Sequence, residues 1–527
     1  MKVRRISRLS RVVALVIGVM LAALPLGAAA DVPIAQWPMS GQNLFNTRSQ
    51  LAEFKISPAN AAKLATKWAF TTGGDVSATP VVGGVVYFPD FAGNLYALNA
   101  TTGAPVWSHQ ISDYNGVAGS YSRTSPAVNG NVLYLGDQTP NTLVWPTGQG
   151  AHMMAVNAQT GQAIWRTTVD THPASIITSS PVVYNNIVYV GVSSNEEAVA
   201  AVIPGYQCCT FRGSLVALNA TTGQILWKTY TVPDGYSGGA VWGSNPVVDP
   251  VRNSLYVGTG NNYNVPDSIS STCLSSTNVS CIASNDYVDS VLALDLGTGA
   301  VKWATLAQGL DFWNVACLFG SSVCPQPEGP DYDFGSAPNL ITFVNNGPPR
   351  QILGVGQKSG IYWAFDPDNG KVLWRTQVGP GGVLGGIEWG SASDGKRIYV
   401  AEANASRLSY TLANGQTVNG GSWAALDPAT GKILWQTADP ASAMDTGPVT
   451  VANGVVYAGS TDPQGHVYAL NAATGQILWS FATGGSVSGG ASVVNGVVYW
   501  GSGYSKLAAQ FGTTGNNKFY AFAAPGS

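Results

Sequence analysis

Charged side chains are scarce in this sequence, and basic ones are the scarcer kind. Asp, Glu, Lys and Arg make up 10% of the 527 residues, with 28 acidic and 25 basic side chains. Five basic residues stand before residue 12, so the chain beyond residue 30 carries 20 basic and 28 acidic residues, a net charge of −8. A nucleic-acid partner requires a positively charged surface, so this balance argues against one.

Long hydrophobic runs are also missing, apart from one near the N-terminus. The uncharged run Val12–Leu24 follows five basic residues and precedes the small residues Ala28–Ala30, a pattern typical of an export signal cleaved near Asp31. A twin-arginine signal at Arg4-Arg5 is the weaker alternative, because the apolar run begins late. No other run approaches the roughly 20 residues that a membrane helix needs. We therefore predict a signal peptide over residues 1–30, no membrane span, and a soluble protein that is periplasmic or secreted.

Cysteine is rare, but its even count is informative. The six cysteines are Cys208, Cys209, Cys273, Cys281, Cys317 and Cys324. An even count in an exported chain favours disulfides. Local bonds would close the loops 273–281 and 317–324 and leave the adjacent Cys208 and Cys209 to each other, although sequence alone leaves the connectivity open. Because consecutive Cα atoms are only about 3.8 Å apart, a bond between neighbours would close a small, strained ring.

An eleven-residue unit recurs along the chain. Its seven copies end at Trp107, Trp165, Trp227, Trp303, Trp374, Trp435 and Trp479. In each copy, as in ALNATTGQILW, Asn or Asp at the third position can bond to nearby backbone and Gly at the seventh supplies positive φ, so the unit predicts strand, tight turn, strand. Runs between the copies, such as SVVNGVVYWGS, predict a second hairpin. Four strands per repeat are one blade of a β-propeller.

An eighth blade can be assembled from the two ends of the chain. The run NNKFYAFAAP resembles the first strand of the unit without its turn and Trp, and LATKWAF supplies a strand that bears Trp68. Joining the two closes the ring without leaving a sheet edge exposed. We predict an all-β, eight-bladed β-propeller as one domain over residues 31–527, with the repeated Trp rings packed between blades.

The unit Ala-x-Asp/Asn-x-x-Thr-Gly-x-x-x-Trp is similar to the tryptophan-docking motif of the quinoprotein alcohol dehydrogenases. Those enzymes are eight-bladed propellers that use pyrroloquinoline quinone (PQQ) and calcium. The likeness begins at WPMSGQNLFNTR, and the non-repeated segments YQCCTFRGS, GGAVWGSNP, VGTGNNY and GPDYDFGSAP most resemble the branch that oxidises polyvinyl alcohol. Non-catalytic scaffold propellers share the repeats, so these segments, rather than the repeats, point to chemistry.

The resemblance implies a flat slot for PQQ. Trp242 in GGAVWGSNP matches the family Trp that lies against one face of the quinone, although a buried core Trp is the plain alternative. In the family a disulfide between adjacent cysteines covers the other face, which implies that role for Cys208 and Cys209. One departure is the order, because here the cysteines follow the SSNEE segment, whereas in methanol-oxidising relatives they precede the first calcium ligand.

The resemblance also implies a calcium site made of oxygen ligands. Glu196 in SSNEEAVA falls where the family has its ligand carboxylate, with Glu197 a near competitor, and Asn261 in YVGTGNN matches the amide ligand. Asp333 completes the expected set. Relatives that use lanthanides carry another Asp two residues after the base, and Gly335 in that place favours calcium.

The catalytic base is implied by the order of a short set of residues. The triplet YDF around Asp333, then Pro338, then KSG beginning at Lys358 keep the family's sequence and spacing. Asp333 would therefore accept the alcohol proton, and Lys358 would donate to the quinone oxygens. Asp311 in LDFWN is the alternative base, because a second Asp-x-Trp pattern stands there.

Further cofactor contacts follow from the resemblance in shorter motifs. Thr178 in IITSSP, Arg123 in SYSRTSP and Trp389 in GGIEWGS match residues that contact cofactor carboxylates or the pocket wall, and each also suits an ordinary packing or turn role. Glu388 stands where the family usually has Asn before that Trp.

Together these motifs imply a dehydrogenase that oxidises secondary alcohol groups, including those of polyvinyl alcohol, to ketones. No Cys-x-x-Cys-His occurs, so a fused c-type haem is not expected and electrons would pass to a separate cytochrome c. A quinoprotein for a small alcohol, aldehyde or sugar is one alternative. A non-catalytic propeller that binds protein partners is the other.

Overall fold

The structure is a computed structural model that describes residues 36–138, 140, 149–243, 245–273, 279–506 and 511–526. The signal peptide expected over residues 1–30 lies outside the described residues, so it stays a prediction, as does the N-terminal boundary of the 31–527 domain. The described residues belong to one compact unit. Within them no helix has both the length and the apolar character needed to cross a membrane.

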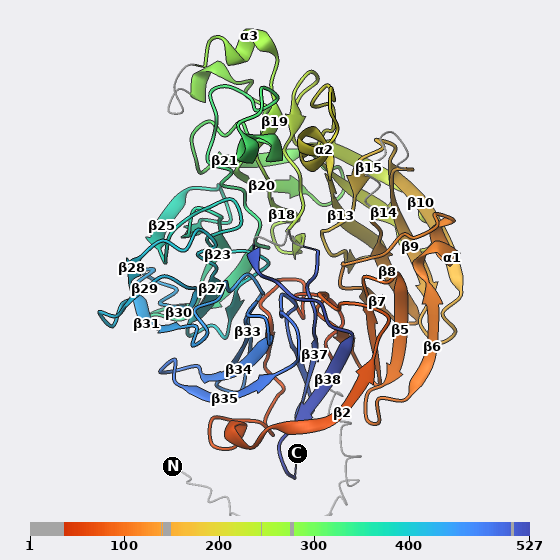
Figure 1. The fold of residues 1–527 in the computed structure, drawn as a ribbon, viewed down its shortest axis with the longest axis vertical. Helices are drawn as coiled ribbons and strands as arrows, with labels where there is room; N and C mark the ends of the chain where they lie inside the picture. Colours follow the sequence, from red (N-terminus) through yellow and green to blue (C-terminus); the bar gives the residue numbers. More distant parts are fainter. Residues whose placement is uncertain are drawn as a thin grey trace, which may run out of the picture. The chain divides into compact units, whose positions relative to one another are not determined.

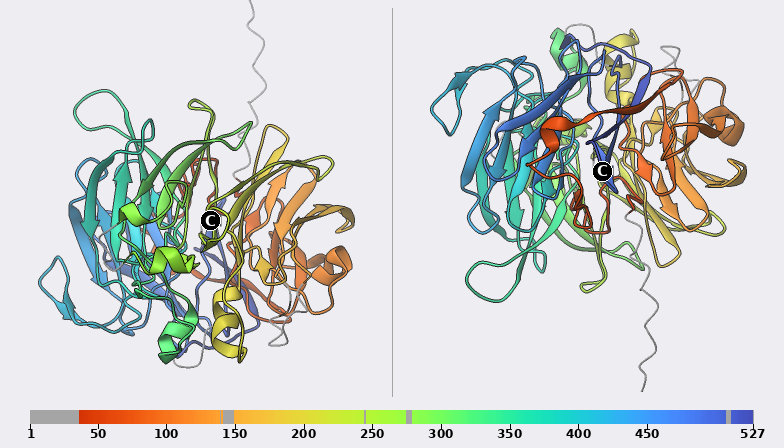
Figure 2. Two further views of the ribbon diagram at one scale, coloured as in Figure 1. Left: turned by 90° about the horizontal axis from the view of Figure 1, so that it is seen from above. Right: turned by 90° about the horizontal axis from the view of Figure 1, so that it is seen from below.

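The described strands form eight antiparallel blades arranged as a β-propeller (Figures 1 and 2), which confirms the predicted fold class. Blade 1 has β3 (Val81–Val82), β4 (Val85–Pro89), β5 (Asn94–Asn99) and β6 (Pro105–Gln110). Blade 2 has β7 (Ala127–Asn129), β8 (Val132–Gly136), β9 (Ala151–Asn157) and β10 (Ala163–Asp170). Blade 3 has β12 (Val182–Tyr184), β13 (Ile187–Ser194), β14 (Ser214–Asn219) and β15 (Ile225–Tyr230), with β11 (Ser175–Ile176) added on β13. Blade 4 has β17 (Val247–Asp249), β18 (Ser254–Gly258), β20 (Ser290–Asp295) and β21 (Val301–Leu306).

The second half of the chain continues the same order. Blade 5 has β22 (Asn339–Phe343), β23 (Arg350–Gly356), β24 (Ile361–Phe365) and β25 (Val372–Gln377). Blade 6 has β26 (Ala392–Ser393), β27 (Ile398–Glu402), β30 (Ser422–Leu426) and β31 (Ile433–Ala438). Blade 7 has β32 (Thr450–Ala452), β33 (Val455–Gly459), β34 (His466–Asn471) and β35 (Ile477–Ala482), with β1 (Ser49–Gln50) added on β32. Blade 8 has β36 (Ser492–Val494), β37 (Val497–Gly501), β38 (Lys518–Ala523) and β2 (Ala65–Thr71).

Blade 8 joins the two ends of the chain, as the sequence predicted. Strand β2 pairs antiparallel with β38, and Trp68 lies opposite Ala521. In Figure 1 the orange-red β2 lies beside the dark blue β38. The pairing gives both strands a partner and closes the ring of blades.

The repeated Trp rings lock each blade to the next. In blade 6 the indole Nε1 of Trp435 donates to the carbonyl of Ala472, at the turn of blade 7, over 3.1 Å. The same bond joins Trp68, Trp107, Trp165, Trp227, Trp303 and Trp374 to the following blade's turn. The turn glycine leaves room for the ring, because a Cβ on Gly475 would lie 2.5 Å from Cε3 of Trp435. The predicted structural role of these rings is confirmed.

Trp479 packs differently because the blade after it is built differently. Blade 8 takes its third strand from the C-terminal run, which lacks the turn of the repeat. Trp479 instead meets Phe522 of β38 edge-to-face, with ring centroids 5.1 Å apart. An aromatic side chain thus replaces the turn as the docking surface at this boundary.

The connections of blades 3 and 4 carry short elements that the repeat does not contain. These are α2 (Glu196–Val202), β16 (Ser237–Gly238), β19 (Asn262–Asn264), α3 (Asp267–Ser270), η2 (Val279–Cys281) and η3 (Val315–Phe319). Helix α2 packs against η3, and β16 pairs with β19. Elsewhere lie η1 (Ala61–Lys63), α1 (Ile111–Asn115), β28 (Tyr410–Thr411) and β29 (Thr417–Val418). The non-repeated motifs of the sequence therefore fall largely in these connections.

Candidate active site

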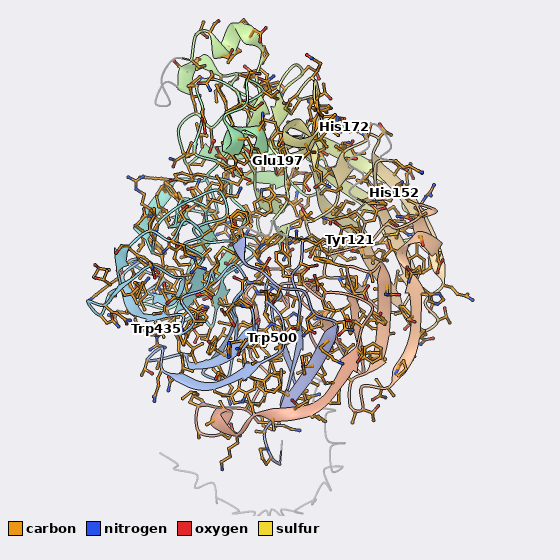
Figure 3. All side chains as sticks on the ribbon, in the orientation of Figure 1. Tyr121, His152, His172, Glu197, Trp435 and Trp500 are labelled. Atoms are coloured by element: carbon orange, nitrogen blue, oxygen red, sulfur yellow. A yellow bond between two sulfur atoms is a disulfide. The ribbon has the colours of Figure 1, made fainter. Side chains whose placement is uncertain are left out.

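A cavity of about 250 Å³ collects side chains from several blades. The residues singled out in the sequence that line it are Arg123, Thr178, Glu197, Trp242, Asp333, Lys358 and Trp389. Residues with no role assigned from the sequence complete it, namely Phe91, Tyr121, Tyr263, Glu388, Tyr504 and Lys506 among others. Figure 3 labels two of the lining residues, Tyr121 and Glu197, and Tyr121 lies nearer the middle of the ring than His152.

Asp333 is the point on which donors converge. Its Oδ2 accepts a hydrogen bond from the indole Nε1 of Trp242 over 2.7 Å, and its Oδ1 accepts from the backbone N–H of Asn261 over 2.8 Å. The ammonium of Lys358 lies 3.2 Å from Oδ2. Only 5% of the Asp333 residue is exposed, so these donors stabilise a carboxylate that has largely left water.

Lys358 is a buried cation between two aspartates. Its Nζ lies 3.0 Å from Oδ2 of Asp331 and also contacts Asp333, and it stands 5.1 Å from the ring centroid of Trp242. Burial alone lowers the pKa of this ammonium, but the attraction of Asp331, Asp333, Glu388 and Glu197 outweighs it and raises the pKa well above its usual value. Lys358 therefore stays charged.

Trp242 is fixed by close packing on both edges. Thr178 donates its hydroxyl to the carbonyl of Trp242 over 2.8 Å, and the ring of Trp389 meets it edge-to-face at 5.2 Å. A Cβ on Gly335 would lie 2.6 Å from Cη2 of Trp242. A larger residue at position 335, such as the Asp of the lanthanide-using relatives, would therefore displace this indole.

Cationic and aromatic side chains cover another part of the wall. Arg123 lies over the ring of Trp389, 4.2 Å from its centroid, and donates to the hydroxyl of Tyr504 over 2.9 Å. Lys506 lies 4.7 Å from the ring centroid of Tyr121. The cavity thus holds three cationic side chains, counting Lys358, that can face an anionic ligand.

The two glutamates of the SSNEE segment point to different surroundings. Glu196 is fully buried away from the cavity, and its carboxylate accepts from the backbone N–H groups of Thr210 and Phe211 at 2.7–3.0 Å and from the Tyr206 hydroxyl. Burial raises the pKa of this carboxyl, but hydrogen bonds from His172, Tyr206 and Phe211 outweigh burial and lower it. Glu196 therefore caps the loop that carries Cys208 and Cys209.

Glu197, by contrast, lines the cavity beside Asp333 and Lys358. Burial raises the pKa of Glu197 to about 7, partly offset by the nearby charge of Lys358. The structure thus brings Glu197, and not Glu196, to the residues that share the cavity.

Asn261 lies directly behind Asp333. Its side-chain N–H₂ donates to the carbonyls of Asn262 and Trp313, which fixes the amide so that Oδ1 has no donor. The residue is 1% exposed, so this oxygen is a buried acceptor without a hydrogen-bond partner. Such an orphaned oxygen, on a residue whose backbone N–H donates to Asp333, fits a hard cation, which takes oxygen ligands.

Asp311, the alternative base, is fully buried and is not among the cavity-lining residues. Its two oxygens accept from the backbone N–H groups of Asp331 and Tyr332 over 2.9 and 2.6 Å. Burial raises its pKa to about 7 against those two hydrogen bonds. Asp311 therefore shapes the turn that presents Asp333.

The six cysteines form three disulfides, two of which close the local loops 273–281 and 317–324. Cys273 bonds to Cys281, Cys317 to Cys324, and Cys208 to its neighbour Cys209. The Cys208–Cys209 disulfide does not line the cavity in the described residues, but Cys209 packs against the same apolar cluster as Trp242, and Tyr263 of that cluster lines the cavity.

Glu388 is a cavity residue that the sequence flagged only as a departure. It is 3% exposed, and its Oε1 has no hydrogen-bond partner. Burial raises its pKa to about 7, while the positive charges of Lys358 and Arg123 act in the opposite direction. The wall beside Trp389 therefore carries a carboxyl that is near its titration midpoint at neutral pH.

Comparison with known proteins places these features in context. The PQQ family model, described as the β-propeller domain of glucose/ethanol/alcohol dehydrogenases, matches residues 37–381, and a model of outer membrane protein assembly factor BamB matches residues 358–521. The chain is 33% identical over 559 residues to a polyvinylalcohol dehydrogenase of Sphingopyxis sp. (strain 113P3), covering 95% of this chain and 79% of the relative. It is 32% identical over 515 residues to a polyvinylalcohol dehydrogenase of Pseudomonas sp., covering 90% and 74%. The solved quinohemoprotein alcohol dehydrogenase ADHIIG of Pseudomonas putida HK5 superposes with a TM-score of 0.71 at 20% identity, covering 94% of this chain and 81% of that one, which shows a shared fold.

Proposed function

Because the chain belongs to the PQQ family of glucose/ethanol/alcohol dehydrogenase propellers, we propose that it oxidises secondary hydroxyl groups, such as those of polyvinyl alcohol, to ketones with PQQ and Ca²⁺. The observation that carries this proposal is the carboxylate of Asp333, held by three donors in a cavity walled by the indole of Trp242. A scaffold propeller has no need of such a group.

The walls of the cavity suit a planar, anionic cofactor. The flat indole of Trp242 suits stacking, and Arg123 and Lys358 supply positive charge for carboxylates of the ligand. Thr178 and Trp389 hold Trp242 in place through the contacts described above. PQQ would supply the two-electron acceptor of the reaction when bound. The Cys208–Cys209 disulfide would support this wall through Cys209, which packs against the same apolar cluster as Trp242.

Three oxygen-bearing side chains are the proposed calcium ligands. The backbone N–H of Asn261 donates to Asp333, and the orphaned Oδ1 of Asn261 would gain a partner from a bound cation. We assign the third ligand to Glu197, because it lines the cavity whereas the carboxylate of Glu196 already serves the 206–211 loop. Gly335 supports calcium over a lanthanide, since no additional carboxylate fits beside Trp242.

Asp333 is the proposed base. Its carboxylate would accept the proton of the substrate hydroxyl, and PQQ, when bound, would supply the acceptor for the carbon-bound hydrogen and its electron pair, which balances the two-electron oxidation of an alcohol to a ketone. The Trp242 and Asn261 N–H groups hold the carboxylate in one orientation. Lys358 stays positively charged beside it and would stabilise negative charge on a bound quinone.

Substrate and electron acceptor follow from the relatives and not from the cavity. The two polyvinylalcohol dehydrogenases share about a third of their residues with this chain, which supports a polymeric or small secondary alcohol as the substrate. A separate cytochrome c is the proposed acceptor, because the sequence contains no Cys-x-x-Cys-His. Export to the periplasm or beyond fits both the disulfides and the N-terminal signal pattern.

The decisive experiment is reconstitution of the purified protein. PQQ and Ca²⁺ are added to cofactor-free protein, and reduction of an artificial dye is followed with polyvinyl alcohol, with a short secondary alcohol and with a short primary alcohol. We expect reduction with the first two. Turnover of the primary alcohol alone would move the assignment to a small-alcohol enzyme, and the absence of any quinone uptake in the absorption spectrum would favour a scaffold.

A further inference from the structure

A second group of carboxylates is buried at the boundary of blades 6 and 7. Glu402 ends β27, Asp439 follows β31, and Asp445 lies on the connection from β31 to β32. Their exposures are 0%, 2% and 0%. These three acids are therefore buried, and the proposed function gives them no role.

The oxygens of these acids lack donors. Both carboxylate oxygens of Asp445, Oδ2 of Asp439 and Oε2 of Glu402 are buried without a hydrogen-bond partner. The ion pairs found among the described residues do not include Asp445, Asp439 or Glu402. A buried carboxylate without a donor or an ion-pair partner costs several kcal/mol, so Asp445, whose polar neighbour is the carboxyl of Asp439, demands a cation or a shared proton.

Asp445 lies close to other oxygen atoms. Its carboxyl lies within hydrogen-bonding reach of Asp439. A Cβ on Gly421 would lie 2.6 Å from Oδ2 of Asp445 and 2.7 Å from the main-chain oxygen of Glu402. The lack of a Cβ at Gly421 therefore lets a carboxylate oxygen and a carbonyl oxygen approach the same point of the backbone, and oxygens of these two kinds are the ligands that calcium prefers.

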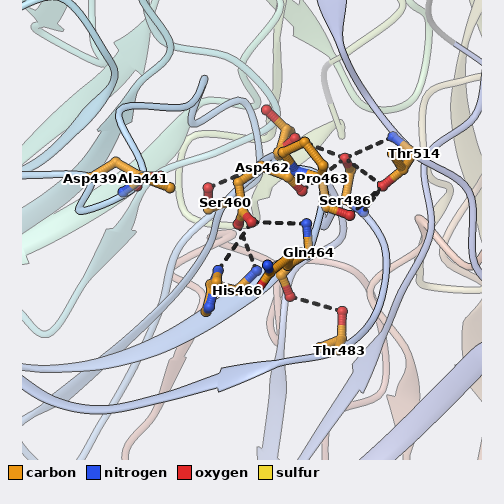
Figure 4. A network of polar contacts seen from close by, with 12 residues as sticks. Asp439, Ala441, Ser460, Asp462, Pro463, Gln464, His466, Thr483, Ser486 and Thr514 are labelled. Carbon is orange, nitrogen blue, oxygen red and sulfur yellow. Dashed lines mark hydrogen bonds and ion pairs between the residues drawn. The ribbon is translucent and has the colours of Figure 1, made fainter.

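A separate cavity of about 400 Å³ lies beside this connection, although Glu402, Asp439 and Asp445 are not among its lining residues. It is lined by Ala441 and Ala443, which flank the connection to Asp445, and by Asp462 and His466 of blade 7. In Figure 4 Asp462 is fully engaged, since it accepts from the backbone of Gln464 and from His466, while Asp439 lies to one side of this network. The carboxylate of Asp462 is thus hydrogen-bonded within its own turn. The oxygens without a partner belong to Asp439 and Asp445 in the neighbouring connection.

Electrostatics point the same way. Burial raises the pKa of Asp445 well above its usual value, and the negative charges of Asp439, Asp462 and Glu402 raise it further. The nearby base His466 already pairs with Asp462 at 3.0 Å. Arg407 also reaches this connection, where it donates to the carbonyl of Ser442, but the ion pairs found in the described part of the chain do not join it to Asp439, Asp445 or Glu402.

We propose that Asp445 and Asp439, with the main-chain oxygen of Glu402 beside them, bind a divalent cation of the calcium class, separate from the calcium site at Asp333. The cation would fasten the 439–445 connection to β27 and so brace blade 6 against blade 7. It takes no part in the reaction. The rival state is a proton shared between Asp439 and Asp445, which satisfies the same oxygens without a metal.

The test counts calcium ions on the full chain without PQQ. Protein stripped with a chelator is dialysed against Ca²⁺, and bound calcium per chain is measured for the wild type, Asp333→Asn and Asp445→Asn. We expect Asp333→Asn to retain one ion and Asp445→Asn to lose that ion. We also expect Ca²⁺ to raise the Tm of Asp333→Asn, because a ligand bound only to the folded state stabilises it.

Each outcome decides between the two sites. If Asp333→Asn binds no calcium and its Tm ignores Ca²⁺, or if Asp445→Asn binds as much as the wild type, the second site does not exist and the shared proton is the better account. If the wild type binds one ion, and Asp445→Asn loses it while Asp333→Asn keeps it, the second site is supported. The proposed site at Asp333 then does not bind calcium in the absence of the quinone. The Asp333→Asn measurement decides the question even if Asp445→Asn does not fold, and Asp439→Asn serves as a second variant.

A matched control is Asp90→Asn. Asp90 is equally buried, but its oxygens already accept from the backbone N–H groups of Gly73, Ala92 and Asn94. Its substitution should lower the Tm while leaving the calcium count unchanged. A loss of calcium in this control would show that neutralising any buried acid disturbs the count.

Discussion

The indole of Trp242 donates to the carboxylate of Asp333 over 2.7 Å, although 91 residues separate them in the chain. Trp242 lies before β17 of blade 4 and Asp333 before β22 of blade 5. One side chain therefore forms a flat wall of the cavity and also orients the proposed base. Any change to this indole acts on ligand binding and on proton transfer together, and the two effects need separate measurements.

The proposed base is tested by Asp333→Asn. The amide keeps the size of the side chain but does not accept a proton, so we expect kcat to fall by a factor of about 10³ or more while PQQ uptake persists. Dye reduction by the reconstituted protein and quinone absorption measure the two quantities. Full activity in this variant would remove Asp333 from the role.

Asp311→Asn is the matched comparison. Its carboxylate accepts from the backbone of Asp331 and Tyr332 and does not line the cavity. We expect a loss of about 1–3 kcal/mol in the free energy of unfolding, because one buried N–H group loses a charged acceptor, and a smaller fall in kcat than for Asp333→Asn. The opposite order of the two kcat values would make Asp311 the base.

The Trp242 hydrogen bond is tested by Trp242→Phe. Phenylalanine keeps an aromatic face but has no N–H, so Asp333 loses one donor worth about 1.5–3 kcal/mol. We expect kcat to fall about tenfold or more and the affinity for PQQ to change less. A fall in affinity with an unchanged kcat would mean that the indole acts only as a wall.

The assignment of the carboxylate ligand is tested by paired glutamine variants. Glu197 lines the cavity, whereas Glu196 holds the 206–211 loop through the N–H groups of Thr210 and Phe211. We expect Glu197→Gln to raise the Ca²⁺ concentration needed for activity by at least tenfold with little change in Tm. Glu196→Gln should lower the Tm and leave the Ca²⁺ requirement near that of the wild type, and a reversed pattern would restore Glu196 as the ligand.

The sequence predicted the propeller because its local signals repeat. Each of the seven copies of the unit carries its own turn glycine and its own Trp, so the same local prediction is made seven times. The packing of Trp435 against Gly475 follows from this repeated pattern. The closing pair β2 and β38 was also predictable, because each end of the chain lacks what the other supplies.

The site was predictable only where a motif fixes a single residue. Asp333, Trp242 and Lys358 stand alone in their motifs, and all three line the cavity. Glu196 and Glu197 are adjacent, and their side chains leave α2 in different directions, which a linear pattern does not encode. Tyr504 reaches Arg123 across 381 residues, and that pairing depends on ring closure and has no local signal.

Glu388 predicts a specific pH dependence of stability. Its pKa in the folded protein is about 7, raised by burial from a usual value of 4.5. A raised pKa means that the folded state binds the proton more tightly, so the stability contribution is complete below about pH 4.5 and is lost as pH rises through 7. In cofactor-free protein, the free energy of unfolding of the wild type should therefore fall relative to that of Glu388→Gln as pH rises from 5 to 8. The relative fall should be about 2–3 kcal/mol at most.

The measurement is urea unfolding of both proteins across that range. The other buried acids, such as Asp311 and Glu197, titrate in both proteins, so the difference between the two curves isolates Glu388. Parallel curves would show that Glu388 keeps its usual pKa. A wild type that instead gains stability relative to Glu388→Gln as pH rises would indicate a partner that holds the carboxylate charged, because a lowered pKa reverses the sign of the effect.

The docking of Trp rings on turn glycines predicts a sharp contrast between two Gly→Ala substitutions. Gly475 has a φ of 75°, and a Cβ there would lie 2.5 Å from the ring of Trp435. Ala must then displace the indole, weaken its bond to Ala472 and adopt a left-handed backbone, so we expect a loss of about 2–4 kcal/mol in the free energy of unfolding. At Gly83 a Cβ meets nothing within 4 Å, and Gly83→Ala should change stability by less than about 1 kcal/mol. Equal Tm values for the two variants would mean that the Trp435 ring can shift without a loss of stability. The contacts between Trp rings and turns would then contribute little to holding neighbouring blades together.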